Sequence, residues 1–228
     1  MDWRGFVFRE GGNVDAIETT KTPKRLAVFI DASNLYRDFR RAFCQDPMLP
    51  TDGQFDPLKL GQLLATRAPL YEDWTLLSTR VYMGQASAAR DSRMAAANDK
   101  QIATWRAMGV AVRPRLLRYP PSWPAVPAQQ KGVDVELAVD VVRLAIENAY
   151  DVGVIVSTDT DLLPALEAVE SLRAAGGPRV LVVGFDGMKK RLRYTDARLP
   201  GLRCIVLTAQ DYVNIFDAMV YVPRREKK

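Results

Sequence analysis

The chain has 228 residues, of which 48% are hydrophobic and 26% are charged, a composition typical of a globular protein with its own core. It contains no histidine, which excludes Ser-His-Asp and Cys-His catalysis and any zinc site that needs imidazole ligands. The formal net charge of +5 is compatible with an anionic partner such as nucleic acid, but it does not identify one.

Neither membrane insertion nor export is indicated. No uninterrupted apolar run approaches the roughly 18 residues that a membrane span needs, and the first 24 residues carry early acids without a long apolar core. Cys44 and Cys204 are far apart in sequence, which favours two reduced thiols. We therefore expect a cytoplasmic protein with an N-terminal extension over residues 1–24, one domain over residues 25–222 and a basic tail over residues 223–228.

In chain order, short apolar runs that predict strands alternate with amphipathic segments that predict helices. The predicted strands are 25–31, 75–84, 110–119, 152–159, 179–185 and 203–208. The predicted helices are 33–43, 58–68, 92–109, 133–150, 164–177 and 209–220. Pro114 interrupts the third strand and places it at a sheet edge. The alternation predicts an α/β/α sandwich with a mostly parallel central sheet.

Acidic residues follow two of the predicted strands. Asp31 comes after "LAVFI", and Asp159 and Asp161 come after "VIVST". Ligand sites of open α/β sheets lie beyond the carboxyl ends of the strands, so neighbouring strands would bring these carboxylates together. A hard cation such as Mg²⁺ or Mn²⁺ would then balance their charge. Two structural roles compete with this hypothesis, since Asp31 and Asp161 could each cap the helix that follows. Asp159 has no such simple structural role.

The predicted helix 133–150 contains two further acids. Its periodicity places one on the apolar face and the other on the solvent-exposed face. Asp134 is centred on the apolar face, so it needs a partner or an exposed position in the first turn. Asp140 falls close to Glu136, Arg143 and Glu147, which predicts a solvent-exposed side chain.

Three segments, "VFIDASNLY", "KGVDVELAVDVVRLA" and "VIVSTDTDLLPAL", together resemble the motifs of NYN domains, a branch of the PIN-like nucleases. Their order and spacing agree with the family over roughly residues 25 to 217, and the LabA-like subgroup is the best match. Ala32 stands where the family usually has glycine, Thr160 replaces serine and Leu162 replaces phenylalanine. None of these departures removes a carboxylate.

The resemblance implies an Mg²⁺- or Mn²⁺-dependent endoribonuclease with an acidic pocket. By motif, Asp31, Asp134, Asp140 and Asp159 would hold the metal, with Asp161 beside them, and Asn34 and Ser157 would orient ligands or water. The family and the helical periodicity disagree on Asp140. A helix that starts later or turns inward would reconcile the two, and we follow the family on this residue.

A nuclease of this kind needs a basic surface, because phosphate contacts supply most non-specific affinity. The sequence offers Arg37, Arg40, Arg41, Lys131, Lys189, Lys190 and Arg191. Each could equally be an ordinary solvated charge. We expect RNA as the partner and no association with a membrane. A homodimer is possible. The alternatives are a non-catalytic module that binds RNA or protein, and a DNA nuclease or phosphatase with the same acids.

Overall fold

The structure is a computed structural model that describes residues 22–46, 48–69, 72–188, 199 and 201–222. In these ranges six strands form one sheet in the order β3-β2-β1-β4-β5-β6, and every neighbouring pair is parallel. The strands are β1 (Lys24–Asp31), β2 (Trp74–Gln85), β3 (Ala111–Leu116), β4 (Val152–Val156), β5 (Arg179–Phe185) and β6 (Arg203–Leu207). The predicted parallel sheet is confirmed, and β3, which contains Pro114, lies at an edge as expected.

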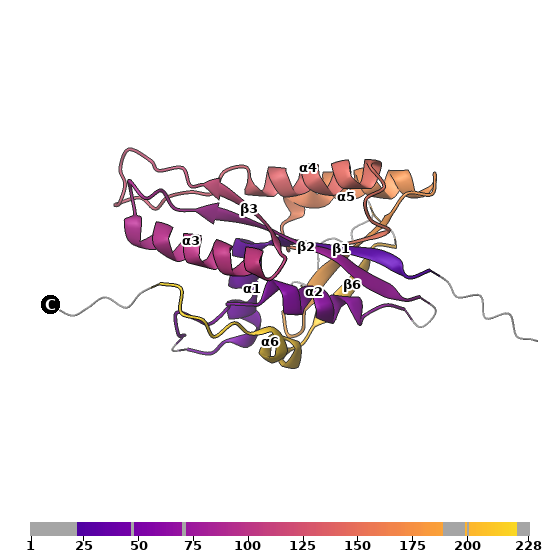
Figure 1. Cartoon of the computed structure of the whole chain (residues 1–228), viewed down its shortest axis with the longest axis horizontal. Helices are drawn as coiled ribbons and strands as arrows, with labels where there is room; N and C mark the ends of the chain where they lie inside the picture. Colours follow the sequence, from indigo (N-terminus) through magenta and orange to yellow (C-terminus); the bar gives the residue numbers. More distant parts are fainter. Residues whose placement is uncertain (1–21, 47, 70–71, 189–198, 200, 223–228) are drawn as a thin grey trace, which may run out of the picture.

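Helices cover both faces of the sheet, which confirms the α/β/α architecture (Figure 1). One face carries α1 (Ala32–Phe43), α2 (Pro57–Ala65), α3 (Ser92–Ala107) and α6 (Ala209–Ile215). The other face carries α4 (Val133–Ile146) and α5 (Leu163–Arg173), which lie side by side. A short 3₁₀ helix, η1 (Thr160–Leu162), precedes α5.

Strand β1 shows why the central strands are continuous apolar runs. Its even-numbered residues, from Leu26 to Ile30, enter the core beneath α1 and α2. Ala27 and Phe29 point the other way, into the core beneath α4 and α5. Because both faces of the strand are buried from Leu26 onwards, no polar residue interrupts it between Leu26 and Asp31, which is the last residue of β1.

Most predicted element bounds differ from the structure by a few residues, and two differences have clear causes. The last helix ends at Ile215, not at residue 220, because Phe216 leaves the helix and pairs with Phe55. Helix α4 ends at Ile146 because the chain turns at Asn148, whose φ is 51°, before it enters β4. The first difference depends on a contact with a distant part of the chain, whereas the turn after α4 is closed by local hydrogen bonds, from Asn148 N–H to Ala145 O and from Ala149 N–H to Leu144 O.

Several expectations concern the chain ends and its environment. Residues 1–21 and 223–228 lie outside the described part of the chain, and β1 begins at Lys24, within the predicted extension. The proposed domain boundaries therefore stay predictions. Within the described ranges, no helix combines the length and apolar character needed to cross a bilayer. Cys44 and Cys204 are not joined in a disulfide.

Candidate functional site

The carboxyl ends of β1 and β4 meet at one edge of the sheet. The two strands pair in register from Leu26 opposite Val152 to Ile30 opposite Val156. Asp31 and Ser157 are the next residues on each strand, and adjacent strands lie about 4.8 Å apart. The segments that carry Asp31 and Asp159 are therefore neighbours, as the acid-site hypothesis requires.

Asp31 has a structural role and an unfavourable charge at the same time. Its Oδ1 accepts hydrogen bonds from the backbone N–H groups of Ser33 (3.1 Å) and Asn34 (3.0 Å), so it caps α1. Only 8% of the residue is exposed. Burial raises the pKa of the Asp31 carboxyl above its ordinary value, and the nearby charge of Asp159 raises it further. Asn34 N–H and Arg37 offset this effect only in part.

Partly buried hydrogen bonds join α1 to the loop that carries Asp159. The backbone N–H of Thr158 donates to Asn34 Oδ1 at 2.9 Å. The Thr158 hydroxyl donates to Asp38 Oδ2 at 2.7 Å, and Asp38 is only 2% exposed. Burial raises the pKa of Asp38, while the Thr158 hydroxyl and Arg41 act in the opposite direction. In this structure Asn34 holds the loop, and its predicted role towards a ligand stays a prediction.

The sequence analysis missed Asp38 and Thr158. One signal was present: Asp38 lies one helical turn after Asn34, so the two side chains share a face of α1. The same face continues from Asp31, which caps the helix. A polar line at the edge of the apolar stripe of Leu35 and Phe39 is therefore readable once the helix is assigned.

Ser157, Asp159 and Asp161 form a tight turn after β4. Ser157 Oγ accepts from the backbone N–H of Asp159 (3.2 Å), and Asp159 Oδ1 accepts from that of Asp161 (3.0 Å). Asp159 therefore caps η1, which corrects the expectation that it lacks a structural role. Asp161 does not cap a helix and is exposed in the first turn of η1.

Asp134 lies in the first turn of α4, where a negative charge interacts favourably with the helix dipole. The helix begins after Gly132, whose φ of 74° favours glycine. Two contacts bring this end of α4 to the same edge of the sheet: α4 packs on η1, and Gln130 Nε2 donates to Ser33 Oγ at the start of α1. Asp134 lies in the first turn, one of the two positions that its periodicity allowed, but it is half-buried there and not exposed.

Asp140 has a different environment, among cationic side chains. Its Oδ2 accepts from the Tyr82 hydroxyl at 2.8 Å, and its Oδ1 accepts from Arg143 Nη2 at 3.1 Å. Guanidinium nitrogens of Arg80 (3.7 Å) and Arg113 (3.9 Å) complete the cluster. Burial alone would raise the pKa of Asp140, but these partners hold it below its ordinary value.

The solvent-exposed position that the periodicity of α4 predicted for Asp140 is wrong, because the residue is only 9% exposed. Arg80 comes from β2 and Arg113 from β3, so strands distant in sequence supply the counter-charges. The metal-ligand role that the family resemblance implies for this residue is not tested by these contacts.

The donor set can be compared with what a divalent ion needs. Among the described residues, no group of three or more Asp, Glu or Cys side chains is placed to hold a metal ion. The edge does provide oxygen donors from Asp31 and Asp159. Mg²⁺ commonly keeps several waters and binds through one or two carboxylates. The residues therefore fit a water-rich site of this kind, with oxygen ligands and no all-protein cage.

The predicted basic residues are either exposed, in contact with other parts of the chain, or outside the described residues. Arg37 and Lys131 are exposed. Arg40 instead anchors a loop, because its Nη1 donates to the backbone oxygens of Leu49 (3.1 Å) and Asp52 (3.0 Å). Arg41 lies 3.9 Å from Asp38. Lys189, Lys190 and Arg191 lie outside the described residues.

The chain is similar to a solved structure and to a protein family. The chain resembles a crystal structure of a protein of unknown function, VPA0982 from Vibrio parahaemolyticus RIMD 2210633, with 16% identity and a TM-score of 0.49 over 81% of this chain and 93% of the other. The comparison with curated proteins found no match. The family model of the NYN domain matches residues 25–198, which include all three sequence motifs. The chain therefore belongs to the NYN domain family.

Proposed function

We propose that this NYN domain is a metal-dependent endoribonuclease whose centre lies at the carboxyl ends of β1 and β4. The observation that supports this proposal most strongly is the pairing of those strands, which places Asp31 beside the Asp159 turn. Burial and the neighbouring negative charge both disfavour ionisation of Asp31. A bound cation would relieve both effects, because it favours the charged form of each carboxylate.

Each side chain has a distinct task in this proposal. Asp31 and Asp159 bind Mg²⁺ or Mn²⁺, and Asp134 approaches from the first turn of α4. A divalent ion bound there supplies an activated water and stabilises charge on the leaving oxygen. Asn34 and Asp38 keep the Asp159 loop at a fixed distance from β1 through Thr158. Asp161 and Ser157 lie on the same turn and complete the polar edge.

Asp140 is not included among the proposed metal ligands. Three guanidinium groups lie within 4 Å of its oxygens, at 3.1, 3.7 and 3.9 Å, and a divalent cation would be repelled by them. We propose that Asp140 instead holds these arginines in place beside the sheet. Membership of the LabA-like subgroup and a cytoplasmic location remain part of the same proposal.

RNA is the proposed substrate, and its phosphates need positive partners near the acids. Arg37 is exposed on α1 and close enough for its charge to lower the pKa of both Asp31 and Asp38. Lys131 is exposed just before α4. We propose these two residues as backbone contacts, since cations beside a metal centre steer phosphate towards it.

A non-catalytic RNA- or protein-binding module is the second candidate, and one observation favours it. Asp31 and Asp159 both cap helices, so their presence has a structural explanation. The described residues also provide no cluster of three acids. In this alternative the fold binds a partner through the same edge without cleaving it.

The test is cleavage of end-labelled single-stranded RNA by the purified full chain with Mg²⁺, Mn²⁺ or EDTA. Asp31→Asn and Asp159→Asn keep a capping oxygen, because asparagine caps helices as well as aspartate does. We expect each to lower cleavage more than about 100-fold, since even the outer partners of metal ligands cost 10–100-fold. Asp73→Asn is the matched control, because Asp73 is exposed at the opposite edge of the sheet.

The outcomes separate the candidates. Cleavage that continues in EDTA, or that Asp159→Asn leaves intact, contradicts the metal mechanism. Binding of RNA without cleavage under either metal supports the non-catalytic module. Parallel reactions with single-stranded DNA and p-nitrophenyl phosphate decide between a ribonuclease and the DNA nuclease or phosphatase alternatives.

A further inference from the structure

Basic side chains gather where α4 lies beside β2 and the edge strand β3. Arg113 and Arg115 belong to β3, and Arg80 belongs to β2 at the level of the first residue of β3. Their contacts with Asp140 and Glu136 show that all three arginines face α4. Residues two apart on a strand share a face, so the arginines follow one another in steps of about 6.6 Å. Together with Lys131 and Arg143 they form a basic flank.

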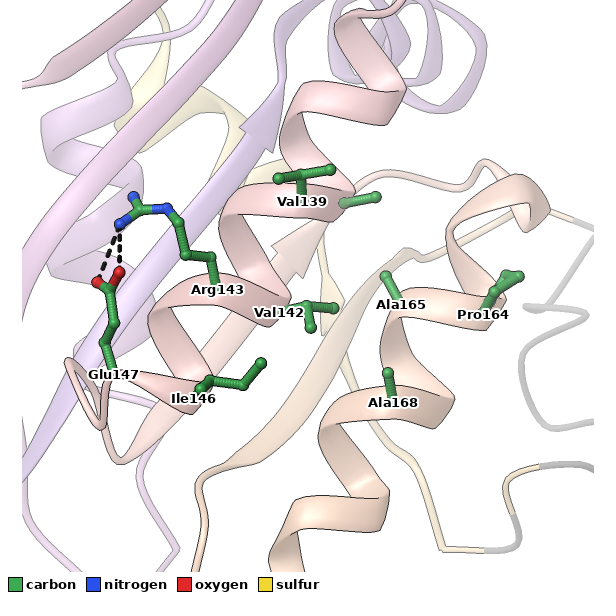
Figure 2. A pocket seen from close by; sticks show the side chains of 9 residues that line it. Val139, Val142, Arg143, Ile146, Glu147, Pro164, Ala165 and Ala168 are labelled. Atoms are coloured by element: carbon green, nitrogen blue, oxygen red, sulfur yellow. Dashed lines mark hydrogen bonds and ion pairs between the residues drawn. The ribbon is translucent and has the colours of Figure 1, made fainter.

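The carboxylates at the centre of the basic flank do not balance the guanidinium groups. Asp140 is shared by Arg80 (3.7 Å), Arg113 (3.9 Å) and Arg143 (3.1 Å). Two nitrogens of Arg80, Nε and Nη1, are buried without a hydrogen-bond partner among the described residues. Figure 2 shows Arg143 on the side of α4 that points away from α5, where Glu147 is its second partner. Three arginines therefore share two carboxylates.

The outer part of the basic flank is open to solvent. Helix α4 packs mainly on β1 and β2, so it leaves the side chains of β3 at the edge of the sheet uncovered. The side chains of Arg113, Arg115 and Arg143 are 46%, 49% and 46% exposed. Arg115 contacts Glu136 at 3.1 Å. Because exposed ion pairs contribute little to stability, these arginines can exchange a carboxylate for another anion.

The basic flank begins next to the proposed metal centre. Gln130 Nε2 donates to Ser33 Oγ at the start of α1, and the backbone N–H of Ser33 donates to Asp31. Two residues after Gln130, the chain passes the arginines of β3, since a Cβ added at Gly132 would lie 3.6 Å from Arg115 Cζ. A polymer bound at Asp31 can therefore continue over this segment onto β3.

We propose that the basic flank guides single-stranded RNA away from the metal centre, with successive phosphates at Lys131, Arg115 and Arg113. The choice of RNA rests on the proposed ribonuclease function. The step between arginines on β3 is close to the spacing of successive phosphates in an extended nucleic-acid strand. Arg143 and the buried Arg80 add positive potential beside this path, which attracts a polyanion.

The first test measures binding of the full chain to fluorescein-labelled single-stranded RNA of ~12 nucleotides, a common site size, by fluorescence anisotropy. EDTA is present, so that cleavage has no influence. Arg113→Gln and Arg115→Gln should each weaken binding and reduce the slope of log affinity against log salt by about 0.7 to 1.

Arg173→Gln is the matched control. Arg173 is 52% exposed and contacts Glu170 at 2.9 Å, so it resembles Arg115 in exposure and in having a carboxylate partner. It ends α5, which packs on β5, and three strands separate β5 from β3. The affinity and the salt slope of this variant should equal those of the natural chain.

The second test increases affinity, which a loss of folding cannot do. Glu136→Gln removes the carboxylate that competes with RNA for Arg115, so binding should tighten about two- to fivefold, the value of an exposed ion pair. Glu170→Gln removes the same charge from the control pair and should have a smaller effect. In the double variant Glu136→Gln/Arg115→Gln the gain should disappear, because the two residues act through one contact.

Three results would overturn the proposed path: unchanged salt slopes in both Arg113→Gln and Arg115→Gln, a Glu136→Gln variant that gains no more affinity than Glu170→Gln, and a natural chain that binds no RNA. The last result would leave the basic flank to an acidic protein segment. Binding along the flank without cleavage would contradict the ribonuclease and support the path. Cleavage that depends on metal, with unchanged salt slopes in both arginine variants, would support the ribonuclease and contradict the path.

Discussion

Asp38 and Asp140 are both buried helical aspartates, yet their surroundings affect them in opposite ways. Asp38, which is 2% exposed, accepts from a neutral hydroxyl on Thr158 and lies 3.9 Å from Arg41. Asp140, which is 9% exposed, accepts from Tyr82 and Arg143 and has Arg80 and Arg113 within 4 Å. Burial raises the pKa of Asp38, whereas its partners hold the pKa of Asp140 low.

The contrast supports the position proposed for the metal site. Around Asp140 the chain supplies more positive charge than the carboxylate requires. At the edge formed by β1 and β4, burial raises the pKa of Asp31 and of Asp38, and the charges of Arg37 and Arg41 offset that effect only in part. Burial of an acid is therefore not sufficient evidence for a metal site. What matters is whether the charge of that acid is already balanced within the chain.

Removal of the Asp140 carboxylate should have the largest effect on stability. Asp140→Ala leaves Arg80, whose side chain is 16% exposed, without its counter-charge. We expect the free energy of unfolding to fall by about 3 kcal/mol, because loss of one partner of a buried ion pair leaves the charge of the other partner buried and uncompensated. Urea denaturation measures the change. Asp140→Asn keeps the shape and should also be destabilising, and a loss below about 1 kcal/mol in both variants would show that the cluster is loosely coupled.

Tyr82→Phe removes one hydrogen bond from the same carboxylate and keeps the ring in the core. The Tyr82 hydroxyl donates to Asp140 at 2.8 Å, and Tyr82 is fully buried. A hydrogen bond to a charged group contributes about 1.5–3 kcal/mol, so we expect a loss of about 2 kcal/mol in the same denaturation experiment. The pKa of Asp140 should rise, since this bond favours its ionised form. An unchanged unfolding free energy would mean that the arginines alone stabilise the carboxylate.

The fold was predictable because its signals are local. Strand β4, "VGVIV", is buried on both faces and is therefore apolar at every position. Asp31 and Asp159 were predictable for a related reason: each follows a buried strand, and parallel strands end at a common edge. The strand assignment and the direction of the chain were enough to predict where these two residues lie.

The remaining parts of the site depend on partners that are distant in sequence. Asp38 accepts from Thr158, 120 residues away, and the polar face that Asp38 shares with Asn34 does not reveal which residue they would contact. Helical periodicity placed Asp140 on a charged flank of α4. It could not show that Tyr82, 58 residues earlier, and arginines from β2 and β3 would bury that flank. The same limitation applies to Arg40, which is basic by composition but serves to hold a loop.

The pH dependence of stability should distinguish the two aspartates. The pKa of Asp38 is above its ordinary value of 3.8 in the folded chain, so its contribution is most favourable at low pH and is lost as the pH rises through the folded pKa. Asp38→Asn cannot ionise and keeps an acceptor for Thr158. We therefore expect it to gain stability over the natural chain as the pH rises above 3.8.

Asp140→Asn should show the opposite profile. The pKa of Asp140 is lowered from 3.8, so its contribution is present above that value and disappears as the pH falls through the folded pKa. The loss caused by the substitution should be constant between pH ~5 and ~7.5 and should shrink only in stronger acid. Parallel pH profiles for the two variants, measured by urea denaturation, would contradict the contrast between their surroundings.

The smallest expected effect concerns two of the three arginines of α1 that were expected to bind RNA. Arg37 is exposed beside the acids, whereas Arg40 donates to Tyr36 Oη (2.9 Å) and to the backbone of the 49–52 loop. In buffer with EDTA, which separates binding from cleavage, Arg37→Ala should reduce the slope of log affinity against log salt by about 1. Arg40→Ala should leave that slope unchanged and lower stability instead, because its hydrogen bonds are internal. Equal slopes for the two variants would place the phosphate path away from α1 and would leave Lys131 as the nearest described candidate.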